Sequence, residues 1–171
     1  MEISEQKYYT IPPLKEHVLR LRETNMFMND YRFFRLVYLT PRCLINMMKH
    51  SLTTANEICG VLLGHVDINN HAYYLTDSYL YPVVGTDSSI VVTLESKIKT
   101  NKRIDLLSKI GRYEDDVGWY HSHPNLHCFY SNTDVRQHLI NRIEKLGTSV
   151  GLVIDPINTM VSAHLNLGAY S

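Results

Sequence analysis

Short apolar runs alternate along the chain with segments that repeat apolar residues at helical spacing. Apolar runs bounded by polar residues, glycine or proline predict strands. The predicted strands cover residues 33–39, 58–64, 72–81, 117–123, 149–154 and 159–166. Apolar residues three or four positions apart predict helices near 14–24, 41–53, 90–110 and 132–146. Strands, hairpins and helices interleaved in this way predict an α/β fold with a mixed sheet.

Two of the predicted helices begin at a recognisable capping residue. Thr40 precedes Pro41, which is the pattern of an N-cap followed by proline at the first helical position. Ser131 is the predicted N-cap of the last helix. We interpret Asp155-Pro156 as a turn between the last two strands.

The composition is that of an ordinary globular domain, and we predict a polar lead-in over 1–30 and one domain over 31–171. Seventeen basic and seventeen acidic residues give zero formal net charge, which favours neither nucleic acid nor an anionic membrane as a partner. No apolar run approaches the length that spans a bilayer. The three cysteines form no CxxC pair, which argues against a disulfide framework and favours a reducing intracellular compartment. The pattern does not separate cytoplasm from nucleus, and we expect the protein in both.

The candidate chemistry centres on His121 and His123, which stand two residues apart in a predicted strand. Residues two apart in a strand point to the same face, so both imidazoles can aim at one point. Asp134 follows in the first turn of the next predicted helix, where a carboxylate can meet the end of the histidine strand. Two histidines and one carboxylate leave one tetrahedral position open, a composition that suits catalytic zinc with a bound water.

Two further residues complete a hydrolytic site in this interpretation. Glu57 opens a strand that can lie beside the histidine strand, and it is the candidate general acid/base for the bound water. Ser131 can donate a hydrogen bond to the oxyanion of a tetrahedral intermediate. Together these residues predict hydrolysis of an amide bond.

Each of these residues also has a simpler interpretation, and spacing alone leaves it open. A His-x-His pair can be buried and hydrogen bonded without a metal, and Asp134 and Ser131 fit a capping box. Glu57 taken alone fits an ordinary surface carboxylate. His127 is a less favoured fourth ligand, because a fourth protein ligand would exclude the water.

The pattern Glu57…His121-Ser-His123-Pro-x6-Ser131-x-x-Asp134 resembles the JAMM (MPN+) motif of metallo-isopeptidases. The flanking stretches Glu-x-x-Gly-Val-Leu-Leu-Gly and Gly-Trp-Tyr-His-Ser-His-Pro match as well, and the resemblance covers about residues 39–170. It implies a single MPN (JAMM, cytidine-deaminase-like) domain with a mixed, mainly antiparallel curved sheet flanked by helices. It also implies that the two histidines and the aspartate bind zinc, that the glutamate is the general acid/base and that the serine assists the transition state.

Within the family, the stretches 81–86 and 166–170 resemble the catalytic branch of the signalosome. That resemblance implies deneddylation of cullins, with neddylated cullin as the substrate. The implied partners are other signalosome subunits, especially a second MPN-domain subunit. A deubiquitinase of the proteasome-lid type and a non-catalytic MPN scaffold are the alternatives.

The chain departs from the family pattern at two places. The relatives carry Gly-aromatic-Gly after the proline of the motif, whereas this chain has Asn125-Leu126-His127, so we expect a stiffer loop. Signalosome relatives carry a glutamate in the flap where this chain has Asp87, and there it is linked to a self-inhibited state. We therefore hypothesise that Asp87 approaches the zinc and displaces the water, although a solvent-exposed loop aspartate is the simpler interpretation.

Overall fold

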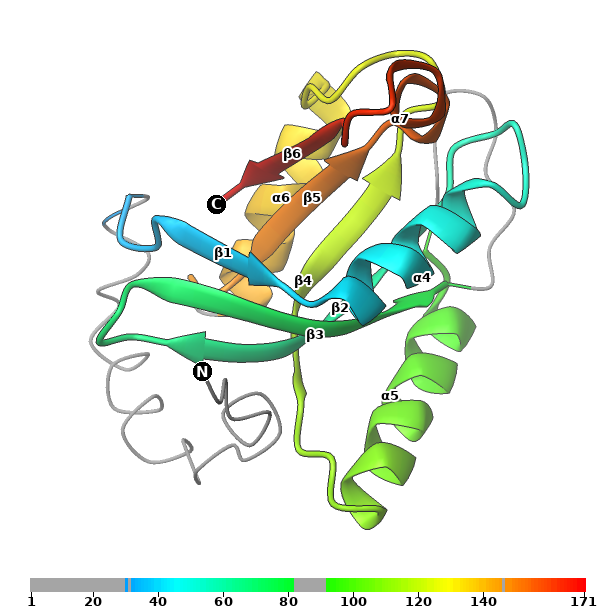
Figure 1. The fold of residues 1–171 in the computed structure, drawn as a ribbon. Helices are drawn as coiled ribbons and strands as arrows, with labels where there is room; N and C mark the ends of the chain where they lie inside the picture. The colour runs from blue at the N-terminus through cyan, green and yellow to red at the C-terminus, as the bar shows by residue number, and fades with distance from the viewer. Residues whose placement is uncertain (1–29, 31, 82–91, 146) are drawn as a thin grey trace, which may run out of the picture.

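The computed structural model describes residues 30, 32–81, 92–145 and 147–171. In this part of the chain six strands form one sheet in the order β1-β3-β2-β4-β5-β6 (Figure 1). The strands are β1 (Leu36–Leu39), β2 (Cys59–Asp67), β3 (Ala72–Leu80), β4 (Asp115–Ser122), β5 (Val150–Ile154) and β6 (Leu167–Tyr170). The helices are α4 (Pro41–Ser51), α5 (Leu94–Lys109), α6 (Asn132–Glu144) and α7 (Pro156–Ser162).

The pairing of the strands is mixed and mainly antiparallel. β1 runs parallel to β3, and β4 runs parallel to β5. The β2–β3, β2–β4 and β5–β6 pairs are antiparallel. The register shifts once in each ladder of β2, which indicates β-bulges that increase twist and bend the sheet. The predicted α/β class and mixed sheet are confirmed.

Helices α4 and α6 cover opposite faces of the sheet (Figure 1). The hydrogen bond of His50 in α4 goes to Tyr120, whereas His138 in α6 accepts one from Trp119. Tyr120 and Trp119 are neighbours in β4, and neighbouring side chains in a strand point to opposite faces. Consequently β4 presents one row of side chains to α4 and the other to α6.

The hydrophobic core lies between α4 and the sheet. Cys43 and Met47 of α4 are fully buried and belong to one cluster with apolar residues of five strand or strand-flanking segments. The largest members from the strands are Leu62, Tyr73, Leu75, Tyr120, Leu152 and Ile154. The α6 side of β4 can carry polar side chains, because the largest cluster of buried apolar residues gathers on the α4 side.

The predicted N-caps are confirmed. The Thr40 side chain accepts a hydrogen bond from the Cys43 amide at 3.2 Å, and Pro41 is the first residue of α4. The Ser131 side chain likewise accepts from the Asp134 amide at 3.2 Å at the start of α6. Because these bonds satisfy amides that lack a partner within the helix, they fix where each helix starts.

The prediction for residues 155–166 is wrong. Residues 156–162 form α7, and the strand that pairs with β5 is β6, which begins only at Leu167. Asp155 is an N-cap that accepts from the Asn158 amide at 2.9 Å, and Pro156 occupies the first turn. The helix then ends at Ala163, whose φ of 56° is left-handed. The N-cap and proline outweigh the strand-like apolar residues that follow.

Other predicted elements are confirmed with shifted ends. Strand β1 begins at Leu36 rather than Phe33, and β4 spans Asp115–Ser122 rather than residues 117–123. Among the described helices, none combines the length and the apolar character that crossing a membrane requires. The predicted lead-in over 1–30 and its helix at 14–24 lie outside the described residues, apart from Asp30, and the domain boundary stays a prediction.

We expect Gly118→Ala to lower the free energy of unfolding by about 1–3 kcal/mol, the usual cost of forcing atoms into a packed region. A Cβ at this position would lie 2.0 Å from the Val150 carbonyl oxygen, so β5 would have to move away from β4. Chemical denaturation measures the change, with Ala169→Ser on the exposed part of the edge strand β6 as the control. Unchanged stability would show that the two strands separate more easily than their close contact implies.

Candidate active site

Strand β4 brings the two predicted histidines together at its carboxyl end. The Nε2 atoms of His121 and His123 lie 3.1 Å apart, and both side chains are buried. Ser122 points to the other face, where its hydroxyl accepts a hydrogen bond from the Ile58 amide at 3.0 Å. The period-two geometry predicted from the sequence is confirmed, and Ser122 ties the histidine strand to the start of β2.

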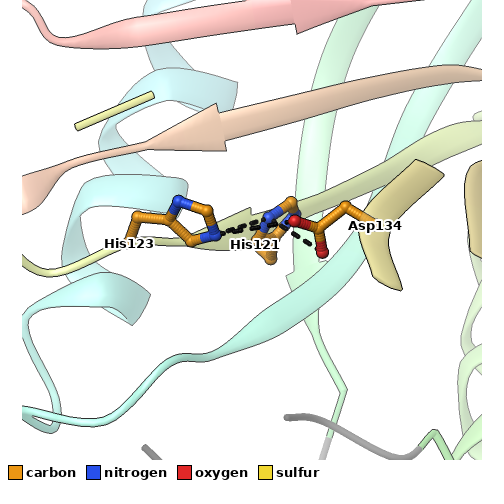
Figure 2. Close-up of side chains that lie close together, drawn as sticks. All are labelled: His121, His123 and Asp134. Carbon is orange, nitrogen blue, oxygen red and sulfur yellow. Dashed lines mark hydrogen bonds and ion pairs between the residues drawn. The ribbon is translucent and has the colours of Figure 1, made fainter. Parts of the chain in front are cut away.

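The carboxylate of Asp134 reaches both histidines from the first turn of α6 (Figure 2). Its Oδ1 lies 3.4 Å from His121 Nε2, and its Oδ2 lies 3.7 Å from His123 Nε2. Two ligand atoms that are each about 2.1 Å from a tetrahedral zinc ion are separated by about 3.4 Å. The separations of His121 Nε2 from His123 Nε2 and from Asp134 Oδ1 lie near this value, and one ligand atom from each of the three residues lies within 4.8 Å of the others. The nitrogen and oxygen donors present therefore fit one divalent ion and leave a position for water.

The protonation states of these groups suit metal binding. Burial acts to raise the pKa of Asp134, but hydrogen bonding and the charge of His121 and hydrogen bonds from Ser131 outweigh it and lower the pKa to about 2. Burial, followed by the neighbouring His121, lowers the pKa of His123. At neutral pH the site therefore offers an ionised carboxylate and a neutral His123 imidazole, the forms that ligate metals.

A hydrogen bond behind His123 fixes which of its ring nitrogens is free. His123 Nδ1 lies 3.2 Å from the carbonyl oxygen of His127, and a carbonyl only accepts, so Nδ1 carries the proton. The lone pair of Nε2 is then directed at the point where Asp134 and His121 converge. Such partners behind a ligand orient it and tune its basicity.

The loop that carries this carbonyl is held by Asp155, whose carboxylate is fully buried. Its two oxygens accept from the amides of Asn125 at 3.0 Å and His127 at 2.9 Å. Asn125 and His127 have φ values of 63° and 68°, a region that favours glycine. The two departures from the family's Gly-aromatic-Gly pattern therefore keep a glycine-like backbone, and Asp155 supplies the hydrogen bonds that hold it.

Glu57 lies beside the histidines, as the sequence predicted. It stands just before β2, which pairs with β4 so that Cys59 is opposite His121. Glu57 Oε1 is 3.5 Å from His123 Nε2. Burial raises the pKa of Glu57, His123 opposes this rise and the Asp134 charge adds to it. A carboxyl group with a raised pKa takes up and releases a proton more readily near neutral pH.

Ser131 is near the site, but its hydroxyl is engaged with the helix cap. Its Oγ donates to Asp134 Oδ2 at 2.6 Å while accepting from the Asp134 amide. This capping box holds the carboxylate toward the histidines. The Ser131 hydroxyl must exchange that bond before it can donate to an oxyanion, and its role there stays a prediction.

The convergent side chains line a cavity of about 270 Å³. Leu126 and Phe129 form an apolar part of its wall, and their side chains are about half exposed, at 49% and 50%. The ring centroids of Phe129 and His123 are 5.0 Å apart. Of the described residues, only His121, His123 and Asp134 form a cluster of potential metal ligands, so His127 contributes its carbonyl rather than a fourth ligand. Asp87 lies outside the described residues.

The profile of the family described as JAB1/Mov34/MPN/PAD-1 ubiquitin protease matches residues 32–144. The chain belongs to this family. All five predicted site residues of the MPN domain fall inside the matched segment, and the resemblance seen in the sequence is confirmed.

Curated relatives of this MPN domain include COP9 signalosome complex subunit 5 from three organisms. The Dictyostelium discoideum protein is 30% identical over 142 residues, 82% of this chain and 42% of the relative. The Drosophila melanogaster protein is 29% identical over 142 residues, which are 82% of this chain and 42% of the relative. The Caenorhabditis elegans protein is 29% identical over 153 residues, which are 89% of this chain and 41% of the relative. The chain thus spans about two fifths of these relatives.

We expect Asp155→Asn to lower the free energy of unfolding of the MPN domain by about 1–3 kcal/mol at pH 7, because an amide nitrogen replaces one buried acceptor oxygen. Burial acts to raise the pKa of Asp155, but hydrogen bonds from Asn158, His127 and Asn125 outweigh it and hold the pKa below its ordinary value. The carboxylate therefore stabilises fully above the unfolded-state pKa of about 3.9, and this contribution is lost as pH falls through the lower folded-state value.

Denaturation from pH 3 to 7 tests this expectation, with Asp105→Asn on the exposed surface of α5 as the control. The difference in free energy of unfolding between wild type and Asp155→Asn should stay constant above about pH 5 and become smaller below about pH 4. A gap that widens toward acid pH would contradict the assigned role of the carboxylate.

Proposed function

We propose that this domain is a zinc-dependent isopeptidase that removes a ubiquitin-like modifier from a lysine of a target protein. The observation that carries the proposal is the convergence of two imidazole nitrogens and one carboxylate at separations of 3.1–3.7 Å, with a second carboxylate 3.5 Å from His123. Membership of a family described as ubiquitin proteases supports the same reaction class.

His121, His123 and Asp134 would hold the zinc, which when bound supplies an acidified water and polarises the substrate carbonyl. The protein's own residues perform the proton transfers. Glu57 accepts the proton of the attacking water and delivers it to the departing lysine amine, a double use that its raised pKa favours. Ser131 releases Asp134 Oδ2 and donates to the oxyanion.

The proposed substrate class follows from the relatives named COP9 signalosome complex subunit 5. We infer deneddylation of cullins in the cytoplasm and nucleus, with other signalosome subunits and a second MPN-domain subunit as partners. The alternatives are a deubiquitinase of the proteasome-lid type and a non-catalytic MPN scaffold. Comparing the turnover of a neddylated cullin with that of a ubiquitin-linked substrate distinguishes the deneddylase from the deubiquitinase. The complete set of three metal ligands favours either enzyme over the non-catalytic scaffold.

We expect the purified chain to bind about one zinc ion per molecule and His123→Ala to bind little, because that change removes one of three ligands. Elemental analysis after zinc supplementation and gel filtration measures the content. His164→Ala is the matched control, since His164 is exposed and outside the ligand cluster. A wild-type protein without zinc would instead support the scaffold.

We expect Glu57→Gln to retain zinc and to lower turnover by about a hundredfold or more, because glutamine cannot carry the proton. The assay uses the chain with its partner subunits, since we expect the isolated domain to be slow. Glu95→Gln on the exposed surface of α5 serves as the control. Full turnover by Glu57→Gln would remove Glu57 from the mechanism even if zinc is bound.

A further inference from the structure

The ring of His121 lies against the indole of Trp119. The two residues are two apart on the same face of β4, and their rings are stacked with centroids 4.7 Å apart and an angle of 13° between planes. Trp119 is the only tryptophan in the chain. Parallel contact between two flat rings restricts the tilt of each, so the indole limits the orientations that His121 can adopt.

The two histidine ligands are oriented in different ways. His123 has a hydrogen bond from Nδ1 to the His127 carbonyl, which fixes its ring. His121 Nδ1 is buried and has no hydrogen-bond partner among the described residues. The usual polar partner behind a metal-binding histidine is therefore replaced at His121 by ring contacts, of which the Trp119 stack is the most nearly parallel.

His138 in turn holds Trp119. The indole Nε1 donates a hydrogen bond to His138 Nδ1 at 3.2 Å. An indole nitrogen only donates, so His138 must be neutral with its lone pair at Nδ1. Burial, followed by the charge of Arg142, lowers the pKa of His138 to about 4, so this form persists at neutral pH. His138 is only 6% exposed.

Helix α6 delivers both this hydrogen-bond acceptor and a candidate metal ligand. Asp134 lies in its first turn, and His138 follows one turn later on the same side. His138 is also confined from β5, because a Cβ at Gly151 would lie 3.1 Å from its Nδ1. The helix thus approaches His121 at two points, directly through Asp134 and indirectly through His138 and Trp119.

We propose that Trp119 and His138 are positioning residues for the metal ligand His121, with His138 fixing the indole and the indole fixing the imidazole. The part of the proposal that concerns metal affinity rests on the proposed zinc site. The ring contact itself does not, because it exists in the polypeptide alone. No role was assigned to His138 from the sequence, and nothing in its local pattern marks it.

The first test compares His138→Leu with His138→Gln, whose side-chain oxygen can still accept from the indole. We expect His138→Leu to weaken zinc binding by about tenfold or more, as for other residues behind metal ligands, and His138→Gln to restore most of the affinity. Trp119→Phe keeps a ring but lacks the N–H group, so it should weaken binding as well. The double variant Trp119→Phe/His138→Leu should then be no weaker than the weaker single variant.

Competition with a chromophoric zinc chelator measures these affinities, and His164→Leu is the histidine control on the exposed surface. Unchanged affinity in His138→Leu would overturn the proposal. Equal losses in His138→Leu and His138→Gln would also overturn it, because the bond to the indole would then be irrelevant. Additive losses in the double variant would do the same.

The second test needs no zinc and so separates this proposal from the proposed function. The ring current of the indole should shift the His121 carbon-bound ring protons upfield in the NMR spectrum of the metal-free protein. We expect His138→Leu to reduce that shift and His138→Gln and His164→Leu to preserve it. If wild type binds no zinc but shows this pattern, the proposed function fails and the positioning contact stands. If His138→Leu leaves the shift unchanged, the positioning role is wrong.

Discussion

The alternation of side chains along β4 is the constraint on which the rest of the structure depends. Tyr120 points toward α4 and the core, and Ser122 accepts the Ile58 amide on that side. The residues between and beside them, Trp119 and His121, point toward α6. The same eight-residue strand can therefore be held by a hydrophobic core on one face while it carries polar ligands on the other. The antiparallel pairing with β2 adds Glu57 to the polar side.

The start of α6 combines two tasks in one pair of residues. Ser131 and Asp134 satisfy free amides at the helix N-terminus, and the same carboxylate is directed at both histidines. Asp134 can serve as both cap and candidate ligand, because the helix begins where the loop from β4 returns to the histidines. The hydrogen bonds from Ser131 also help to keep the Asp134 carboxylate ionised, the form that binds metals.

The sequence predicted those parts of the fold and site that depend on local spacing. His121 and His123 share a face because of strand periodicity, and Thr40 and Ser131 cap their helices because of side-chain chemistry. The same chemistry at Asp155-Pro156 was interpreted as a turn, since the apolar residues that follow resemble a strand, and they prove to be exposed on α7. The bonds from Asp155 to the loop, and from Trp119 to His138, join residues 19–30 positions apart. No local pattern encodes such contacts, because they arise only when separate elements pack together.

The convergence of the ligands has a consequence for how folding responds to the environment. The folded chain already holds His121, His123 and Asp134 within reach of one ion, whereas an unfolded chain disperses them. An ion that binds only the folded form shifts the folding equilibrium toward it, by about 1.4 kcal/mol for each tenfold excess of free ion over the dissociation constant. Folding and cation supply are thermodynamically linked through this cluster, so the fraction of folded chain depends on the free concentration of any ion that the cluster accepts.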